Sequence, residues 1–211
     1  MAFSTKTMNT AGLTTKDIRK SLRASRRQLS IKAQSDASLQ VCRNILRLPR
    51  FIKSQSIAVY FPSDGEVDLH PLIEHCWRLK KSVFLPVLHP FKSGELIFMP
   101  YTLGAPLAKN RFGIPEPSTA SKPQIKPWYL DLVFTPLVGF DCDGNRMGMG
   151  GGFYDRTFNF MSNNLRAHNP NMVGIAHECQ KVDSLNSAPW DIPMQWIVTP
   201  EQIYKGKSNQ V

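Results

Sequence analysis

The sequence predicts an α/β protein with a mainly parallel sheet, flanked by helices on both faces and preceded by a basic N-terminal helix. Two observations support this fold class. Short, continuously apolar runs recur along the chain, which is typical of strands buried on both faces. Helical segments separate most of these runs, and strands that alternate with helices form largely parallel sheets. A chain of 211 residues suits one core, so we expect a single domain at 14–205 between a flexible tail at 1–13 and a C-terminal tail at 206–211.

The first predicted element is a basic amphipathic helix that begins near Lys16 and runs on to about Leu48, where Pro49 ends it. At about 100° per residue, its apolar side chains fall on one side. A stripe of cations lies beside them, at Lys16, Lys20, Arg23 and Arg27, with Arg19 and Arg26 between the two. The stripe is either a solvated face or a group of charges that closes over an anionic ligand.

Strands and helices are then expected to alternate. A helix is predicted at 71–80, with Asp68 available as its N-cap, and another at about 153–165. The Pro-rich stretch 102–127 predicts an ordered loop with little regular structure. The predicted strands are 56–61, 83–85, 96–99, 132–135, 172–176 and 196–198. In such a three-layer, Rossmann-like fold, ligands bind beyond the carboxyl ends of the strands, so residues 61–66, the segment 145–156 and the chain after Ala176 are expected to share a cleft.

The segment 145–156, NRMGMGGGFYDR, is the strongest chemical signal in the chain. Its glycines allow backbone N–H groups to converge on an anion, and the start of the following helix adds positive potential. Arg146 and Arg156 add mobile positive charge, and Asp155 adds a carboxylate of the kind that holds Mg²⁺ against phosphate oxygens. The segment therefore predicts a nucleotide phosphate site. A purely structural turn between a strand and a helix remains the alternative.

The segment is neither of the two best-known phosphate loops. A Walker loop requires Lys and then Ser or Thr after its last glycine, where this chain has Phe153 and Tyr154. The dinucleotide fingerprint requires G-x-G-x-x-G, whereas residues 148–152 read G-x-G-G-G. A phosphate site here must belong to another family.

The formal net charge of +10 is confined to one part of the chain. Residues 1–50 hold 11 Lys and Arg against Asp17 and Asp36, a net of +9, which leaves +1 for residues 51–211. No aromatic interleaving and no recognition motif accompanies the basic segment. We therefore expect no nucleic-acid partner.

The cysteines and the apolar runs indicate where the protein works. Cys42, Cys76, Cys142 and Cys179 form no C-x-x-C pair, so four free thiols are expected. No apolar stretch approaches the roughly 18 residues of a membrane span, and the first 15 residues lack the apolar core of a secretory signal. We expect a soluble, cytoplasmic monomer without a membrane partner.

Several segments together resemble the 5-formyltetrahydrofolate cyclo-ligase family, also called methenyltetrahydrofolate synthetase. The run DLVFTPLVGFDCDGNRMGMGGGFYDR at 131–156 matches the family in order and spacing. Four further pieces support the resemblance: K-x-x-R at Lys16 and Arg19, YFPSDGEVD around Glu66, FGIPEP at 112–117, and VGIAHE followed by WDIP around Asp191. The resemblance covers about residues 16–200.

The resemblance implies an ATP- and magnesium-dependent ring closure. The family converts 5-formyltetrahydrofolate to 5,10-methenyltetrahydrofolate and releases ADP and phosphate. A formyl group on nitrogen is a weak electrophile, and its oxygen is a poor leaving group. Transfer of the γ-phosphoryl group to that oxygen provides a phosphate leaving group, so the protein has mainly to align the substrates and neutralise charge.

The family's functional residues match positions of this sequence. Asp155 and Asp191 match two magnesium-associated carboxylates, and Phe61 and Glu66 match folate contacts. Lys16, Arg19 and Lys20 match the segment that contacts the ATP phosphates, although the family's lysine aligns equally well with Thr15. Nucleotide contacts are implied throughout the loop, at Arg146, Met147, Gly148, Met149, Gly150, Gly151, Gly152, Phe153 and Tyr154. Met149, Gly150, Gly151, Gly152 and Phe153 also match folate contacts, and Arg146, Tyr154 and Asp155 are the implied catalytic residues.

Structural alternatives remain for single positions. Phe61 ends an apolar run and is equally suited to the core, and Tyr154 could pack on the sheet. Glu66 could be a solvated turn residue, and Asp191 could cap a turn before Pro193. Arg156 is also compatible with a plain helix surface.

Two other classes of function compete with the enzyme. One is a catalytically silent relative that holds folate or nucleotide, and the intact glycines and both aspartates argue against it. The other is a nucleic-acid module that uses residues 16–50.

Overall fold

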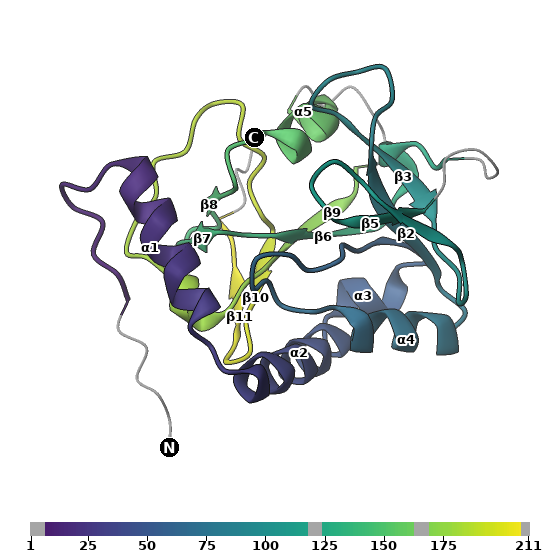
Figure 1. Cartoon of the computed structure of the whole chain (residues 1–211), viewed down its shortest axis with the longest axis horizontal. Coiled ribbons are helices and arrows are strands. Elements are labelled where there is room, and N and C mark those ends of the chain that lie inside the picture. Colours follow the sequence, from purple (N-terminus) through teal and green to yellow (C-terminus); the bar gives the residue numbers. More distant parts are fainter. Residues whose placement is uncertain (1–6, 118–123, 163–168, 208–211) are drawn as a thin grey trace.

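A seven-stranded sheet forms the centre of the molecule in the computed structural model, which describes residues 7–117, 124–162 and 169–207. The strand order is β11-β10-β9-β6-β1-β2-β3. The five inner strands run parallel, and β3 and β11 pair antiparallel at the two edges, which confirms the mainly parallel sheet (Figure 1). The strands are β1 Ser56–Ala58, β2 Ser82–Leu88, β3 Leu96–Pro100, β6 Leu132–Pro136, β9 Asn171–Ile175, β10 Trp196–Val198 and β11 Ile203–Lys205.

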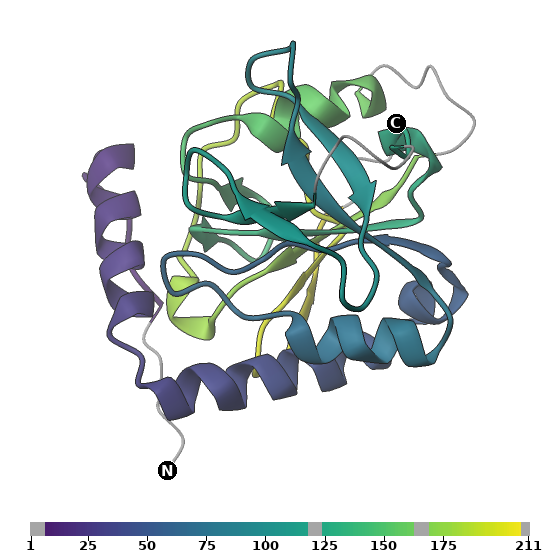
Figure 2. The same ribbon diagram turned by 45° about the vertical axis from the view of Figure 1, so that its right-hand side comes forward.

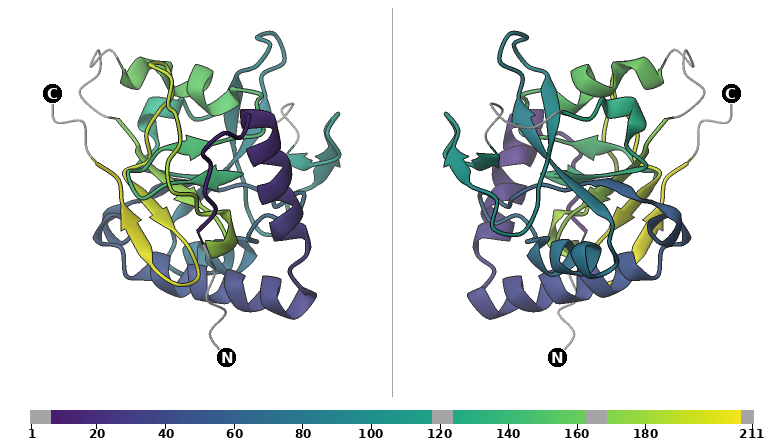
Figure 3. Two further views of the ribbon diagram at one scale, coloured as in Figure 1. Left: turned by 90° about the vertical axis from the view of Figure 1, so that its left-hand side faces the viewer. Right: turned by 90° about the vertical axis from the view of Figure 1, so that its right-hand side faces the viewer.

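Helices cover both faces of this sheet. Helices α2 (Ile31–Leu46), α3 (Pro49–Lys53) and α4 (His70–Arg78) lie together on one face, and α5 (Phe153–Phe158) lies on the other (Figures 1 and 3). Three short 3₁₀ helices complete the helical elements of the described residues, η1 at Pro127–Tyr129, η2 at Asn159–Met161 and η3 at Glu178–Gln180. The three-layer expectation is therefore correct.

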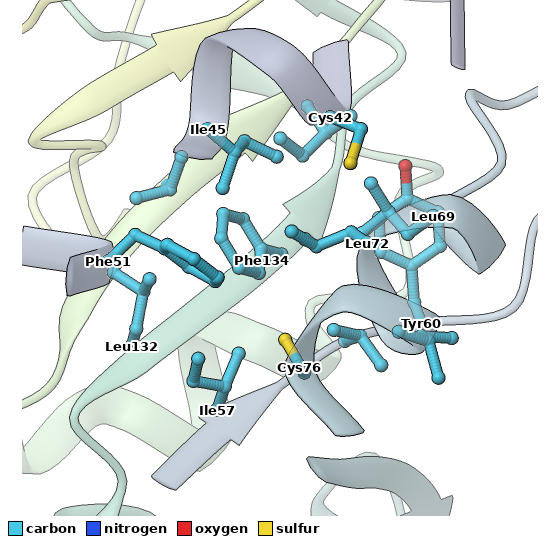
Figure 4. Packing of buried hydrophobic residues seen from close by; sticks show 14 of the residues in the cluster. Cys42, Ile45, Phe51, Ile57, Tyr60, Leu69, Leu72, Cys76, Leu132 and Phe134 are labelled. Carbon is cyan, nitrogen blue, oxygen red and sulfur yellow. The ribbon is translucent and has the colours of Figure 1, made fainter. Parts of the chain in front are cut away.

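Alternation along β6 divides the core between the two faces. Leu132 and Phe134 point into the cluster under α2, α3 and α4, whereas Val133 points into the cluster that contains Phe158 of α5. Figure 4 shows Leu132 and Phe134 beside Phe51 of α3 in the first cluster. Each fully buried side chain of this size contributes about 1.5–3 kcal/mol of hydrophobic free energy. β6 therefore stabilises both layers, as do β1, β9 and β10, which also have residues in both clusters.

The long basic helix predicted up to Leu48 is wrong, because three helices occupy this region. Helix α1 spans Thr15–Arg27, and Ser30 then caps α2 by accepting the Ala33 N–H at 3.2 Å. Pro49 lies in the first turn of α3 rather than ending a helix, since its fixed φ and missing N–H suit that position. Figure 2 shows the consequence, which is that α1 turns away from α2 along the side of the sheet.

Several boundaries also differ from the sequence prediction. β1 is shorter than 56–61, and β11 was not predicted. The stretch 102–127 contains a small hairpin of β4 (Leu107–Lys109) and β5 (Pro115–Pro117). The cap of α4 is Leu69, without a side-chain bond, and Asp68 instead accepts the His70 N–H at 2.9 Å. The helix predicted at 153–165 ends at Phe158 and continues as η2, while 163–165 lie outside the described residues.

The segment just before α1 contacts the body of the protein. Met8 N–H donates to the Lys181 carbonyl at 3.3 Å, and Thr10 Oγ1 donates to the Asp183 carboxylate at 2.7 Å. The domain at 14–205 with flanking tails stays a prediction. All four cysteines are free thiols, as expected. Within the described ranges, no helix is both long and apolar enough to cross a bilayer.

Candidate active site

A cleft of about 1260 Å³ opens at the carboxyl ends of the central strands. Phe61 and Glu66 follow β1, Thr135 and Pro136 end β6, and Asp191 comes from the chain after β9. All of these residues line the cleft together with the whole glycine-rich loop at 148–152. The prediction that these three segments share a cleft is therefore confirmed, because the carboxyl ends of parallel strands meet at one edge of the sheet.

A short hairpin, rather than β6 directly, delivers the glycine-rich loop. β7 (Gly139–Phe140) pairs antiparallel with β8 (Arg146–Met147), and the loop runs from β8 to α5. Gly150 and Gly152 have φ of +94° and +61°, a region that side chains rarely adopt. Helix α5 has only six residues, so its dipole is a smaller part of the site than the sequence suggested.

Three guanidinium groups face the glycines of the loop, those of Arg146, Arg19 and Arg156. A Cβ added at Gly152 would lie 2.8 Å from Arg156 Nη1. A Cβ added at Gly148 would lie 4.0 Å from Arg146 Nη1, and one added at Gly150 would lie 3.8 Å from Arg19 Cζ. Arg19 reaches the loop from α1 and donates from Nε to the Gly148 carbonyl at 3.0 Å. The space that side chains would fill is thus bordered by backbone and by these three cations, which suits a phosphate chain.

The structure distinguishes among the cations of α1. Arg19 and Thr15 line the cleft, whereas Lys16 and Lys20 are exposed and lie outside its lining. Thr15 is the alternative register for the family's lysine, and it borders the cleft together with Arg19. The assignments of Lys16 and Lys20 stay predictions.

Asp155 joins three parts of the chain at the floor of the cleft. Its carboxylate pairs with Nη2 of Arg146 and accepts the Ile192 N–H at 3.2 Å through Oδ1. Arg146 Nε in turn donates to the Ile192 carbonyl at 3.2 Å. These contacts bring Asp191, the neighbour of Ile192, to the same wall of the cleft as Asp155.

The two aspartates fit a magnesium ion that is held partly by phosphate. Asp191 has the turn role considered above, because Oδ2 accepts the Ala188 N–H at 2.8 Å, and it also lines the cleft. In the part of the chain that the structure describes, no cluster of three or more His, Cys, Asp or Glu side chains forms a complete metal cage. Mg²⁺ favours one or two carboxylates with phosphate oxygens and water, so this donor set suits it when nucleotide is present.

The other end of the cleft is aromatic and carries one carboxylate. Phe61 meets Tyr101 edge to face, with ring centroids 5.3 Å apart, and Tyr154 stacks on Phe158 at 6.4 Å. Both Phe61 and Tyr154 therefore pack against the core and also line the cleft, so the packing role of each is confirmed and its contact with folate stays a prediction. Burial and the nearby Glu66 carboxylate raise the pKa of Tyr154, which makes it a hydrogen-bond donor rather than a base.

Glu66 is a nearly buried carboxylate rather than a solvated turn residue. Its side chain is 9% exposed, and Oε2 accepts the Ser63 N–H at 3.0 Å. Burial raises its pKa, and the Ser63 N–H and the Arg26 guanidinium partly offset that effect. A carboxylate in such surroundings is suited to bind a ligand edge that carries N–H donors.

Arg156 was expected either to add positive charge to the phosphate site or to be a plain helix surface residue. It is exposed and lines the cleft, where it donates to the Gly94 and Gly151 carbonyls and lies over the Phe153 ring at 5.8 Å. Phe112 and Trp190 line the cleft although they are 57% and 67% exposed. They belong to the FGIPEP and WDIP segments, which are identifiable as motifs in the sequence. The sequence did not predict that these two side chains border the cleft.

Thr135 is a further unassigned residue in the lining of the cleft. Its Oγ1 is buried and has no hydrogen-bond partner among the described residues. A hydroxyl group that is buried in this way is unusual and carries no signal in the sequence.

His177 predicts a loss of stability in mild acid. Its Nε2–H donates to the Gly65 carbonyl at 3.1 Å, and burial lowers its pKa to about 4 from the ordinary 6.5. The unfolded chain therefore binds a proton at higher pH than the folded protein, and stability falls as pH drops from about 6.5 to about 4, by up to about 3 kcal/mol. Urea midpoints across this range should fall for the unchanged protein and stay flatter for His177→Gln. If the urea midpoints of the two proteins fall equally with pH, His177 is not the cause of the loss of stability.

Comparison with known proteins is consistent with this site. The sequence model of the 5-formyltetrahydrofolate cyclo-ligase family matches residues 13–200. The chain is 40% identical to the 5-formyltetrahydrofolate cyclo-ligase of Escherichia coli strain K12 over 87% of its own length and 99% of the relative. It is 41% identical to the Haemophilus influenzae cyclo-ligase over 84% and 92%. The solved 5,10-methenyltetrahydrofolate synthetase of Aquifex aeolicus superposes with a TM-score of 0.76 at 30% identity, over 93% of this chain and 95% of that one.

Proposed function

This chain belongs to the 5-formyltetrahydrofolate cyclo-ligase family, and we propose that it converts 5-formyltetrahydrofolate to 5,10-methenyltetrahydrofolate with consumption of ATP. The observation that carries the proposal is the shared cleft. It holds a glycine loop between two arginines at one end, two aspartates on one wall, and an aromatic end with Glu66. A nucleotide and a folate can therefore lie in contact within one cleft.

The chemistry follows from this arrangement. The formyl oxygen attacks the γ-phosphorus, the bond to the β,γ-bridging oxygen breaks, and ADP leaves. N10 then attacks the formyl carbon, the carbon–oxygen bond breaks as inorganic phosphate leaves, and N10 loses its proton. Arg19, Arg146 and the loop N–H groups neutralise the charge on the phosphates, which is the main demand of phosphoryl transfer. Asp155 and Asp191 would hold Mg²⁺, which would supply further neutralisation of the phosphate charge.

The folate end of the cleft is assigned to recognition. Glu66 accepts hydrogen bonds from the donor edge of the pterin, and Phe61 and Phe112 border the ring system. Tyr154 lies between the glycine loop and Glu66 and keeps its proton, so it orients the formyl group as a donor. Arg146 fixes Asp155 through their ion pair.

The deciding experiment is turnover of the purified chain. Incubation with 5-formyltetrahydrofolate and magnesium-ATP should produce the near-ultraviolet absorbance of the methenyl product, with ADP formed in equal amount. Omission of ATP or of magnesium should abolish the signal. Tight folate binding without turnover by well-folded protein would instead show a silent binding protein.

We propose the cytoplasm as the location of the protein. Its four cysteines are free thiols, which is usual in a reducing compartment.

Arg19→Ala should weaken ATP binding selectively. Its guanidinium lies at the glycine loop, and loss of one charge-assisted contact to phosphate is expected to raise KM for ATP about tenfold or more. KM for the folate should change little. The control is Lys32→Ala, which removes an equal charge from α2, where Lys32 is exposed and pairs with Asp36. An unchanged KM for ATP, or an equal rise in the control, would remove Arg19 from the nucleotide site.

A further inference from the structure

The guanidinium of Arg26 is completely buried, which is unusual for a charged side chain in a basic surface helix. Every one of its nitrogens has a partner. Nε donates to the Asp64 carbonyl at 2.8 Å, Nη1 to the Leu137 carbonyl at 3.0 Å, and Nη2 to Asp64 Oδ2 at 3.0 Å. Nη2 also lies 3.5 Å from Glu66 Oε1. Arg26 thus connects α1 to the end of β6 and to the turn at 63–66.

The turn that Arg26 contacts has two consecutive residues in the left-handed region. Asp64 has φ of +52° and Gly65 has φ of +77°, and a Cβ at Gly65 would lie 3.3 Å from the Arg26 carbonyl oxygen. Few side chains other than Asp and Asn adopt this region, and contacts around the turn help to hold it. Gln34 and His177 add bonds around the same turn, to the Arg26 and Gly65 carbonyls at 3.1 Å each.

Glu66 ends this turn and faces the cleft, so the shape of the turn sets the position of its carboxylate. Ser63 and Glu66 close the turn with a backbone bond of 3.0 Å, and the Ser63 N–H holds one carboxylate oxygen. Arg26 faces the other oxygen. We propose that Arg26 is a positioning residue for folate binding, which does not touch the substrate and acts by holding Glu66 in the cleft.

This inference rests on the proposed function for the identity of the ligand, since Glu66 is assigned there to the pterin. An apolar side chain could fill the space of a buried arginine without the desolvation cost of a charge. A buried cation at this point has the added effect of favouring the ionised form of Glu66, which alone accepts two donors. The charged groups that act directly on Glu66 are Arg26 from α1 and Asp64 from its own loop. Tyr60 after β1 and Tyr154 of α5 are its titratable neighbours. Asp68 acts on Tyr60, and Arg146 acts on Tyr154.

Removal of Arg26 should therefore have a pH-dependent effect on folate affinity. Burial already raises the pKa of Glu66, and loss of the cation raises it further. Arg26→Met should weaken 5-formyltetrahydrofolate binding about tenfold or more at pH about 6, and the deficit should shrink as pH rises to about 9. Arg26→Lys keeps the positive charge but cannot make all the bonds of the guanidinium to Asp64 and Leu137. Its folate affinity should therefore depend on pH as that of the unchanged protein does, with a smaller reduction that is the same at every pH.

The measurement is titration calorimetry with 5-formyltetrahydrofolate in the absence of ATP, so it does not require turnover. Arg27→Met is the matched control, because Arg27 is on the same helix and pairs with the same Asp64 carboxylate, but is 53% exposed. It should bind folate within about twofold of the unchanged protein, as is usual for an exposed ion pair. In a Glu66→Gln background, Arg26→Lys or Arg26→Met should add little further loss, since a residue that acts through Glu66 has no effect without it.

Two results would overturn the inference. One is a loss in Arg26→Met that is the same at every pH, or a loss in either variant that adds fully to that of Glu66→Gln, since either result would make Arg26 a structural residue only. The other is absence of folate binding by the unchanged, folded protein. Failure of the proposed reaction is distinguishable from both, because it would appear as folate binding with the expected variant effects but no product.

Discussion

Asp155→Asn is expected to reduce turnover by about a hundredfold or more, since even residues that only support a metal ligand typically contribute 10- to 100-fold. The amide keeps the shape and can still accept the Ile192 N–H, but it loses the negative charge that pairs with Arg146 and that we propose binds Mg²⁺. The magnesium concentration for half-maximal rate should rise as well. Initial rates over a magnesium titration at saturating ATP measure both effects.

The matched control for this variant is Asp143→Asn. Asp143 is 48% exposed, pairs with Lys207 at 2.8 Å, and borders a smaller neighbouring cavity rather than the cleft. Its turnover and magnesium titration should stay within about twofold of the unchanged protein. Circular dichroism should show both variants folded. A magnesium titration of Asp155→Asn that overlays that of the unchanged protein would contradict the metal role.

Gly150→Ala is the second change with a large expected effect. The φ of +94° makes a side chain unfavourable by about 1–3 kcal/mol, and the new Cβ would enter the space between the loop and Arg19. The loop must then either distort or present a methyl group where a phosphate is expected. We expect KM for ATP to rise by at least about tenfold, because each 1.4 kcal/mol of lost interaction is a factor of ten.

Gly104→Ala is the matched control, because it adds a side chain at positive φ without changing the proposed phosphate site. Gly104 has φ of +74° with nothing within 4 Å of an added Cβ, and it does not line the cleft. Both variants should lose a similar amount of stability to urea, whereas only Gly150→Ala should lose ATP affinity. If the two variants bind ATP equally well, the open face of the loop is not the phosphate site.

The class of fold was predictable because it depends on local patterns. Continuous apolar runs such as Leu132–Pro136 identify strands buried on both faces, and helical segments between them imply parallel connections. Helix boundaries were less predictable. The residues around Ser30 fit a continuous helix by periodicity, but in the structure Ser30 caps a separate helix and α1 packs with Val138 and Met147, which are distant in sequence.

The candidate site was predictable to the level of segments and not of contacts. The NRMGMGGGFYDR segment, Glu66 and Asp191 were identified by residue type and motif, and all of them border one cleft. The bond from Arg156 to Gly94 and the bordering of the cleft by Phe112 and Trp190 were not foreseen. The Arg156–Gly94 bond and the places of Phe112 and Trp190 depend on how separate loops pack against each other. The residue spacing within one loop does not specify that packing.

The sequence by itself determined the chemistry available to this protein: glycines that admit an anion, carboxylates that suit Mg²⁺, and an excess of positive charge in the first 50 residues. The tertiary structure decided where those charges lie. Arg19 reaches the glycine loop, Lys16 and Lys20 remain exposed, and Arg26 is buried against Leu137, which lies 111 positions away. The physical reason is that residue type and periodicity are local, whereas burial and pairing of a charge depend on the packing of elements far apart in the chain.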